Sequence, residues 1–296
     1  MHIISYLRII IFPYSDLALF MKVSIITINR NNLAGLEATY QSIASQSYKD
    51  FEWVVIDGGS TEGDREFLEQ HASEMAWWCS EPDRGVYNAQ NKGITHARGE
   101  WMIFMNSGDI FNNKTVLESV FTKEHSADIL YGDWVRVYED GRAEEVHAPK
   151  TVSLHGIYQD NICHQAMFIR SSVMKSSPYD ESYKIYADWA KWVELTLKKC
   201  RFEYLPLYVC DFRLGGMSSD LDLAKTELEI MRQKELSPAI LETIQPMCME
   251  GGYEIINEVA LLVSQRKTYR RIIRFALFLC GILKKLHKER AKKDYI

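Results

Sequence analysis

The sequence predicts an α/β domain with a mostly parallel sheet flanked by helices, followed by a helical C-terminal region. Apolar, largely β-branched runs alternate with segments of helical spacing over residues 22–105, and small or acidic residues follow three of these runs. In such an alternation each helix crosses between neighbouring strands, so the strands run parallel and helices cover both faces. The balance of 47% apolar and 25% charged residues indicates a folded soluble protein and excludes a disordered or multi-span membrane chain.

The first half of the domain carries this alternation. Strands are expected at residues 22–29, 51–57, 75–79 and 101–105, and helices at residues 33–45, 65–71 and 86–97. The strands are short apolar runs such as EWVVID and WMIFM. In the first helix Leu36, Tyr40 and Ile43 recur at helical spacing.

The second half is less regular. The sequence predicts a hairpin over residues 129–138 and 142–147, strands at 166–170 and 202–212, and helices at 188–197 and 221–235. The dipeptide Asp140-Gly141 is typical of a hairpin turn. Because no stretch rich in Pro, Gly or Ser divides the chain, we expect one catalytic domain over residues 21–220 and a helical region over residues 221–296.

Residues 1–20 are expected to be an extension ahead of this domain. Their apolar run is interrupted by Pro13 and Asp16, is too short to cross a bilayer and precedes no small-residue cleavage site. Met21 directly opens the first predicted strand. Two interpretations stay open: translation starts at Met21, or the extension is an interfacial anchor.

The C-terminal tail differs in charge from the rest of the chain. Residues 266–296 hold eleven Lys or Arg and two acidic residues, a net charge of +9, which leaves −14 on the other 265 residues of a chain with total charge −5. The apolar run at residues 275–283 is too short to span a membrane. The pattern favours a helix that lies on an anionic membrane surface. The alternative is a helix that packs on the domain or on a second copy in a homo-oligomer.

Charge and cysteine content narrow the class of protein further. An acidic body disfavours nucleic-acid binding, which needs a basic surface. The six cysteines are scattered and none forms a CxxC pair, as in a reduced cytosolic protein. We therefore expect a cytoplasmic protein that is peripheral at the inner face of the cytoplasmic membrane.

Polar clusters follow three predicted strands, at residues 27–32, 57–60 and 106–109. Ligands bind beyond the carboxyl ends of parallel strands, so we expect a nucleotide-type site there. Asp109 is expected to hold Mg²⁺ or Mn²⁺ beside a diphosphate, or else to cap a following helix. Asp57 is expected to accept hydrogen bonds from a base or a ribose, or else to serve its own turn.

Four other residues have both a chemical and a structural interpretation. Arg84 and Lys92 are cations available to a phosphate, or they are solvated surface groups. Asp188 begins a predicted helix whose dipole would keep it ionised and basic, or it caps that helix. His164 is a candidate ligand or a satisfied structural group.

The ordered series of motifs resembles the family-2 glycosyltransferases, which have the GT-A fold. The matching pieces, between about Lys22 and Gly216, are VSIITINRN, SIASQSYKDFEWVVIDGGSTEGD and SEPDRGVYNAQNKGITHARGEWMIFMNSGD, with weaker matches in YGD, CHQAMFIR, YADWAKWVEL and FRLGGMS. No single piece is specific, whereas the order of all of them is.

The resemblance implies an inverting transfer from a nucleotide-sugar donor, with a UDP-sugar favoured. The residues implied to bind the donor are Thr27, Asn29, Asp57, Asp83, Arg84, Asn91, Lys92 and Ser107. Within this set Asp57 would be the carboxylate on the uracil or ribose side. Asp109 would match the last acid of the DxD-like metal motif of the family. Asp188 would match the general base that deprotonates the acceptor hydroxyl.

Two departures from the family pattern affect these roles. The family often has Asp-Asp-Gly-Ser after the second strand, where this chain has Asp57-Gly58-Gly59-Ser60, so one carboxylate near the base is missing. The metal motif often carries two or three acids, whereas Asn106 and Gly108 leave Asp109 as its only acid. His164 is therefore a candidate second metal ligand or an acceptor contact.

These observations predict a metal-assisted glycosyltransferase that acts on a glycan or lipid-linked hydroxyl acceptor in cell-surface polysaccharide assembly. Two other functions stay open. One is a sugar-nucleotide nucleotidyltransferase, although residues 27–31 lack its Gly- and Lys-rich phosphate loop. The other is a non-catalytic partner that binds nucleotide.

Overall fold

The computed structural model describes residues 21–215 and 221–244. The predicted N-terminal extension, residues 1–20, and the predicted membrane-binding tail, residues 266–296, lie outside these described residues. Residues 216–220, the last five of the predicted catalytic domain, lie outside them as well.

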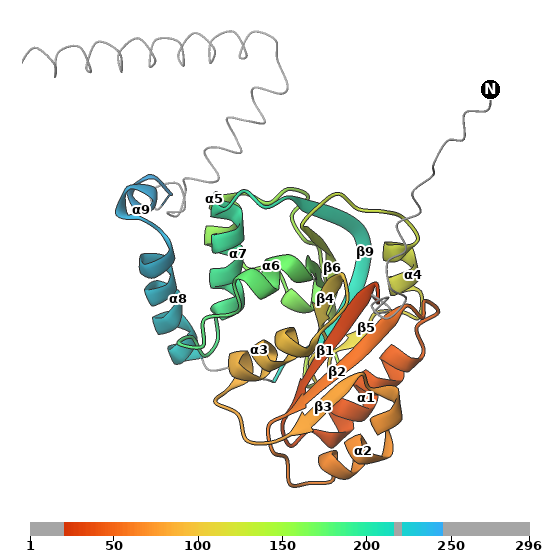
Figure 1. The fold of residues 1–296 in the computed structure, drawn as a ribbon. Coiled ribbons are helices and arrows are strands. Elements are labelled where there is room, and N and C mark those ends of the chain that lie inside the picture. The colour runs from red at the N-terminus through yellow and green to blue at the C-terminus, as the bar shows by residue number, and fades with distance from the viewer. Residues whose placement is uncertain (1–20, 216–220, 245–296) are drawn as a thin grey trace, which may run out of the picture. The chain divides into compact units, whose positions relative to one another are not determined.

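The first half of the chain alternates strand and helix as its sequence predicts (Figure 1). Its elements are β1 (Val23–Asn29), α1 (Leu33–Ala44), β2 (Phe51–Asp57), α2 (Asp64–Gln70), the 3₁₀ helix η1 (Ala72–Glu74), β3 (Trp77–Ser80), α3 (Val86–His96) and β4 (Trp101–Phe104). Each predicted element is present, and its bounds differ from the prediction by at most two residues.

The second half contains the predicted hairpin and the other predicted elements, together with short ones that the sequence did not indicate. Its elements are β5 (Ile110–Phe111), α4 (Val116–Phe121), β6 (Ile129–Val137), β7 (Ala143–Val146), α5 (Leu154–Gln159), η2 (His164–Ala166), β8 (Met167–Arg170), α6 (Ser171–Ser176), α7 (Ala187–Leu197), β9 (Phe202–Arg213), α8 (Leu221–Glu235) and α9 (Pro238–Ile244). The hairpin of β6 and β7 turns at Gly141, whose φ is +83°.

A single sheet joins both halves in the strand order β3-β2-β1-β4-β8-β6-β9-β5, with β7 paired to β6. The strands β3, β2, β1 and β4 run parallel, in a register that pairs Asn29 with Asp57 and Ile26 with Phe104. Beyond β4 the sheet is mixed, because β8 runs antiparallel to β4 and β6 while β9 runs parallel to β6. The predicted α/β class is confirmed, and its parallel part is the first half.

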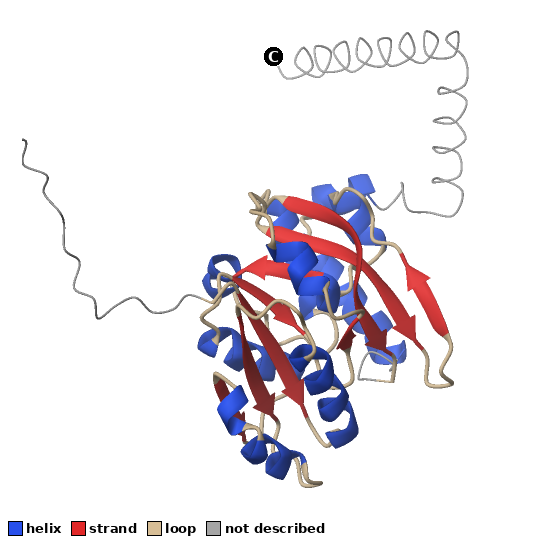
Figure 2. Ribbon diagram, turned by 90° about the vertical axis from the view of Figure 1, so that its right-hand side faces the viewer, coloured by secondary structure: helices blue, strands red, loops and turns tan. Residues whose placement is uncertain are grey.

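The parallel strands are covered by helices on both faces, with α1 and α2 on one face and α3 on the other (Figure 1). Right-handed crossovers require this arrangement, since the chain moves outward from β1 to β3 and then returns past β1 to β4. Helix α3 packs very close to the sheet at Gly93, where an added Cβ would lie 2.4 Å from Cγ2 of Ile26. In Figure 2 the long strands of the second half curve away from this parallel layer.

Helix α8 belongs to the larger of two compact units of the chain. The contacts of the chain divide it between Glu235 and Leu236 into two compact units, so α8 lies in the first unit and α9 in the second. No helix within the described ranges has both the length and the apolar character needed to cross a membrane.

Candidate functional site

A cavity of about 840 Å³ opens at the carboxyl ends of β1 and β4. Its wall combines both halves of the chain: the loops after β1 and β4, the segment before α3, the strands β6 and β9, and the segments before η2 and α7. Parallel strands bind ligands at this edge. Of the predicted site residues, those that line the cavity are Asn29, Asp83, Ser107, Asp109, His164 and Asp188.

Asp109 is held at the cavity by the loop that follows β4. Gly108 takes a φ of +103°, which places its N–H 3.0 Å from the Thr39 hydroxyl oxygen and turns the chain toward the cavity. The Asp109 carboxylate accepts hydrogen bonds from the Gln165 side-chain amide at 2.8 Å and from the Arg213 backbone N–H at 3.1 Å. Only 5% of Asp109 is exposed, and burial raises the pKa of its carboxyl to about 6 despite these two donors.

The surroundings of Asp109 fit a cation that arrives with a phosphate. No cluster of three or more His, Cys, Asp or Glu side chains is present among the residues that the structure describes, so they hold no complete protein cage. Mg²⁺ in proteins is commonly held by one or two carboxylates together with substrate phosphate oxygens and waters. The buried Asp109 carboxylate provides one such ligand, and a bound cation would offset the cost of its burial.

Asp188 lies in the first turn of α7 and collects four hydrogen bonds. Its Oδ1 accepts from the Trp189 N–H at 2.8 Å and the Tyr87 hydroxyl at 3.1 Å. Its Oδ2 accepts from the His164 ring at 3.1 Å and the Asn161 amide at 3.3 Å. Tyr186 occupies the N-cap position, so the alternative that Asp188 caps this helix is wrong. A fixed, nearly buried carboxylate therefore faces the cavity.

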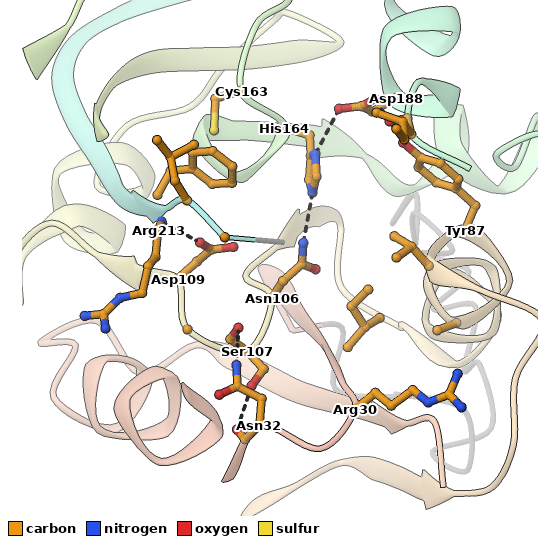
Figure 3. A pocket seen from close by; sticks show the side chains of 18 of the residues that line it. Arg30, Asn32, Tyr87, Asn106, Ser107, Asp109, Cys163, His164, Asp188 and Arg213 are labelled. Carbon is orange, nitrogen blue, oxygen red and sulfur yellow. Dashed lines mark hydrogen bonds and ion pairs between the residues drawn. The ribbon is translucent and has the colours of Figure 1, made fainter. Parts of the chain in front are cut away.

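His164 connects Asp188 to the loop that carries Asp109 (Figure 3). Its Nδ1 faces Asp188, and its Nε2 lies 3.3 Å from the side-chain nitrogen of Asn106. Since a carboxylate only accepts and an amide NH₂ only donates, these two contacts fit the tautomer that carries its proton on Nδ1. A metal on Nε2 would have to displace the Asn106 amide.

The donor-side residues at the end of β1 form a buried network beneath the cavity floor. Asn29 donates from Nδ2 to Asp57 and to Asp64, at 2.8 Å each. Asp57 also accepts from the Ser60 N–H at 2.9 Å and the Ser80 hydroxyl at 2.6 Å. Burial alone would raise the pKa of Asp57, but these hydrogen bonds hold it below the ordinary value. Asp57 is fully buried and does not line the cavity.

Four further predicted donor residues lie away from the cavity. Thr27 is fully buried and its hydroxyl accepts from the Trp53 indole N–H at 2.9 Å. The side chains of Arg84 and Asn91 both turn to Glu181, at 2.7 and 3.1 Å. Lys92 forms an ion pair with Glu81 at 2.6 Å. These residues are satisfied by protein partners.

Besides Asn29, two predicted residues on the donor side line the cavity. The side chain of Asp83 accepts from the Gly85 N–H at 2.9 Å and thereby shapes the turn before α3. Ser107 donates its hydroxyl to the Asn32 carbonyl at 3.1 Å, and Asn32 in return donates its amide to the Ser107 carbonyl at 3.1 Å (Figure 3). This exchange fixes the loop after β4 against the start of α1.

Cations at the cavity come from positions that the sequence did not single out. Arg30, Lys184 and Arg213 line it, and none of them has an ion-pair partner within the described ranges. Arg30 and Arg213 lie inside the motifs TINRN and FRLGG, so the motifs themselves contained the signal. These two guanidinium groups and one ammonium group lie at the cavity, whereas Arg84 and Lys92 do not line it.

Comparison with known proteins identifies the domain. Residues 24–177 match the sequence profile described as Glycosyl transferase family 2, slightly more than half of the chain. The chain belongs to glycosyl transferase family 2. The matched residues include the loop of Asp109 and His164. Asp188, β9 and α8 lie beyond the C-terminal end of the match.

Relatives of this family-2 domain occur in mycobacteria. A PGL/p-HBAD biosynthesis glycosyltransferase of Mycobacterium tuberculosis is 33% identical over 174 residues, which cover 56% of this chain and 66% of that relative. An uncharacterized glycosyltransferase of the same species is 31% identical over 222 residues, or 72% of this chain and 83% of the relative.

Solved structures share the GT-A fold of this family-2 chain. Staphylococcus aureus TarS 1–349 in complex with UDP-GlcNAc superposes with a TM-score of 0.59 at 22% identity, covering 76% of this chain and 70% of TarS. The mannosyltransferase PcManGT from Pyrobaculum calidifontis, in complex with GDP-Man and Mn²⁺, gives 0.55 at 16% identity, covering 89% and 86%. At these identities the likeness establishes the fold.

Proposed function

We propose that this chain is an inverting glycosyltransferase that moves a sugar from a nucleoside-diphosphate sugar to a hydroxyl of a glycan or lipid-linked acceptor. One observation carries the proposal: Asp109 and Asp188, from different halves of the chain, line the same cavity. A single carboxylate near the donor phosphates and a second, fixed carboxylate across the cavity are what a one-step displacement needs.

The donor end of the cavity is proposed at the loops after β1 and β4. Asn29, Asp83 and Ser107 line this end, and the unpaired Arg30 provides positive charge for a diphosphate. Asp57 is proposed to act on the donor through Asn29, since it contacts that residue from below the floor. Structures with UDP-GlcNAc in TarS and GDP-Man in PcManGT support a nucleotide-sugar donor, with a UDP-sugar favoured.

Asp109 is proposed to hold Mg²⁺ or Mn²⁺ together with donor phosphate oxygens. When bound, such a cation neutralises charge that develops on the leaving diphosphate. Gln165 and the Arg213 backbone N–H fix the carboxylate, so it needs no rearrangement when the donor enters. The Mn²⁺ in the PcManGT complex supports this choice of cofactor.

Asp188 is proposed to accept the proton of the attacking hydroxyl. His164 and Tyr87 hold its two oxygens in place through hydrogen bonds of 3.1 Å each. Because Nδ1 of His164 already serves Asp188, we propose that His164 positions this base rather than binding the metal. Direct displacement with the base opposite the leaving group inverts the anomeric carbon.

The acceptor is proposed to enter between β6, β9 and the segment before α7. Trp134, Phe212 and Tyr186 line that part of the cavity and offer apolar faces on which a sugar ring can stack. The PGL/p-HBAD relative supports an acceptor in bacterial surface-glycan assembly. We propose a peripheral location at the cytoplasmic membrane, where the basic tail of residues 266–296 would bring the cavity to a lipid-linked acceptor.

A panel of sugar nucleotides tests this proposal. The purified chain is screened with UDP-, GDP- and dTDP-sugars and Mn²⁺ for a rise in melting temperature, and products are then analysed with membrane-extracted lipid acceptors. Release of a nucleoside diphosphate with a glycosylated lipid supports the transferase. Release of pyrophosphate would identify a nucleotidyltransferase, and binding without turnover would identify a non-catalytic partner.

A further inference from the structure

Three consecutive backbone N–H groups next to the cavity point at one buried carboxylate. The N–H groups of Lys184, Ile185 and Tyr186 lie 2.7, 2.6 and 2.8 Å from the side-chain oxygens of Glu227 in α8. Glu227 is 7% exposed. It lies 41 to 43 residues further along the chain, beyond the residues 24–177 that match the family profile.

This arrangement compensates for a costly burial. A buried carboxylate is tolerated when several hydrogen bonds satisfy its oxygens, and a concave run of backbone N–H groups is a known way to do so. The N–H groups at the start of a helix have no partner within that helix, and α7 begins at Ala187, directly after Tyr186. Glu227 thus satisfies the Tyr186 N–H at the N-cap of α7, together with the N–H groups of the two residues before it.

The segment that Glu227 holds is connected to Asp188. The Ile185 carbonyl accepts a hydrogen bond from the Tyr87 hydroxyl, and the same hydroxyl lies 3.1 Å from Oδ1 of Asp188. Lys184 and Tyr186 also line the cavity. A shift of this segment would therefore move the Tyr87 contact, the wall beside Asp188 and the first turn of α7 together.

Other residues of α8 contact parts of the chain that precede this segment. Lys234 pairs with Asp180, and Glu235 accepts from the Tyr183 hydroxyl at 2.9 Å. Arg232 donates to the Tyr158 carbonyl at 2.8 Å, and its guanidinium lies over the Tyr158 ring. Glu227 differs from them because it contacts the three residues that directly precede α7, the helix of Asp188.

We propose that Glu227 is a positioning residue for Asp188: it fixes residues 184–186 and so sets the place of the proposed base without touching substrate. The proposal rests on the proposed function, in which Asp188 takes the acceptor proton. Glu227 would affect the rate through the position of Asp188, because a misplacement of a catalytic group by about 1 Å can cost on the order of 10²-fold in rate.

The variant Glu227→Gln tests the proposal, with Glu229→Gln as its matched control. Glu229 lies on the same helix but is exposed and contacts Gln233 of its own helix. The amide of Glu227→Gln has nearly the size of the carboxylate but turns one acceptor into a donor that faces backbone N–H groups. Two readouts are compared: hydrogen–deuterium exchange of the full chain over residues 180–190, and nucleoside-diphosphate release with the sugar nucleotide that the panel identifies.

We expect faster exchange at residues 184–186 in Glu227→Gln and a kcat about tenfold lower, with KM for the sugar nucleotide within about twofold of the original. Glu229→Gln should match the original chain in both readouts. To separate positioning from partial unfolding, kcat is expressed per molecule that binds UDP with Mn²⁺, or GDP or dTDP if the panel selects these.

Unchanged exchange at residues 184–186 would overturn the inference. So would a kcat per binding-competent molecule equal to that of the original chain, because Glu227 would then serve folding alone. An original chain that releases no nucleoside diphosphate from any sugar nucleotide would overturn the proposed function itself. Failure of the function is thus seen in the original chain, and failure of the inference is seen in the variant.

Discussion

The two halves of the sheet differ in what their polar side chains face. In the parallel half Asn29, which lines the cavity, donates to the buried carboxylates of Asp57 and Asp64. In the mixed half Asp188 and Arg213 face the cavity, and the Arg213 guanidinium has no ion-pair partner among the described residues. Asp109 lies where the halves meet, on a loop of the first half but held by Gln165 and Arg213 of the second. The first half thus supplies the buried floor together with Arg30 and Asp109 at the cavity, and the second half supplies Asp188 and Arg213.

The comparison is tested most strongly at Asp188. Replacing it with Asn keeps the shape but removes the proton acceptor, so we expect kcat to fall about 10²- to 10⁴-fold while donor binding is unchanged. Nucleoside-diphosphate release and calorimetry with UDP and Mn²⁺ measure the two quantities. Asp140→Asn, in the exposed turn between β6 and β7, is the control. A loss of less than about tenfold would contradict the assignment of Asp188 as the base.

Replacing Asp109 with Ala should instead affect binding. It removes the only carboxylate of the loop after β4, so we expect Mn²⁺-dependent nucleotide binding to weaken about 10²-fold. Calorimetry with UDP in the presence of Mn²⁺ or EDTA measures the difference. If the affinity of Asp109→Ala for UDP still differs between Mn²⁺ and EDTA as much as that of the original chain does, the metal is held elsewhere.

The parallel half of the sheet was easier to predict from the sequence than the mixed half. A buried parallel strand reads as an unbroken apolar run, which is why β1, β2 and β4 were found nearly to the residue. The two-residue strand β5 carries no pattern, and its pairing with β9 joins residues about a hundred positions apart. Local sequence could therefore show the hairpin of β6 and β7 but not the pairing of β5 with β9.

The same distinction applies to the site residues. Asp109 and Asp188 line the cavity. They could be predicted because the end of a strand and the start of a helix can be recognised in a sequence. Arg84 was expected near the donor, yet it pairs with Glu181, which is 97 residues away in the chain. Thr27 has the expected position along β1, but its side chain points to Trp53 in the core. Which face of an element a side chain takes, and which distant charge neutralises it, are tertiary facts.

A lower pH should weaken nucleotide binding through Asp109, but by less than the substitution Asp109→Ala does. Burial raises the pKa of Asp109 to about 6, so the group is ionised at pH 7.5 and mostly neutral at pH 5. A metal ligand must be deprotonated, hence we expect Mn²⁺-dependent nucleotide binding to weaken about tenfold between these values. Calorimetry at both pH values checks this, with Asp109→Asn as the control that lacks the titration.

The raised pKa of Asp109 should weaken nucleotide binding at low pH but increase the stability of the fold there. An acid whose pKa is higher in the folded state gives a folded protein that holds more protons between pH 4 and 6. Without metal, the free energy of unfolding should therefore rise as the pH falls through 6, relative to Asp109→Asn. Denaturation by urea at pH 7.5 and 5 measures it. Equal pH dependence in both chains would mean that Asp109 titrates normally.

His164 contacts Asp188 of the second half and Asn106 of the first half. Its replacement is expected to have the smallest effect on kcat. In His164→Asn the new amide can still donate to Asp188 but no longer reaches Asn106, so we expect kcat to fall about fivefold, the effect of one ordinary hydrogen bond. His147 also donates to a buried acid, Asp133, at 2.9 Å, but lies outside the cavity lining. His147→Asn is therefore the matched control.

The size and kind of the His164→Asn effect distinguish three roles. A fivefold loss in kcat with unchanged Mn²⁺ dependence fits a ring that orients the proposed base. A loss as large as that of Asp188→Asn would mean that the imidazole itself takes the proton, with Asp188 as its partner. Weakened Mn²⁺-dependent binding, as expected for Asp109→Ala, would make His164 a metal ligand. In that case the ring would have to leave Asn106, because its Nε2 can serve only one of them.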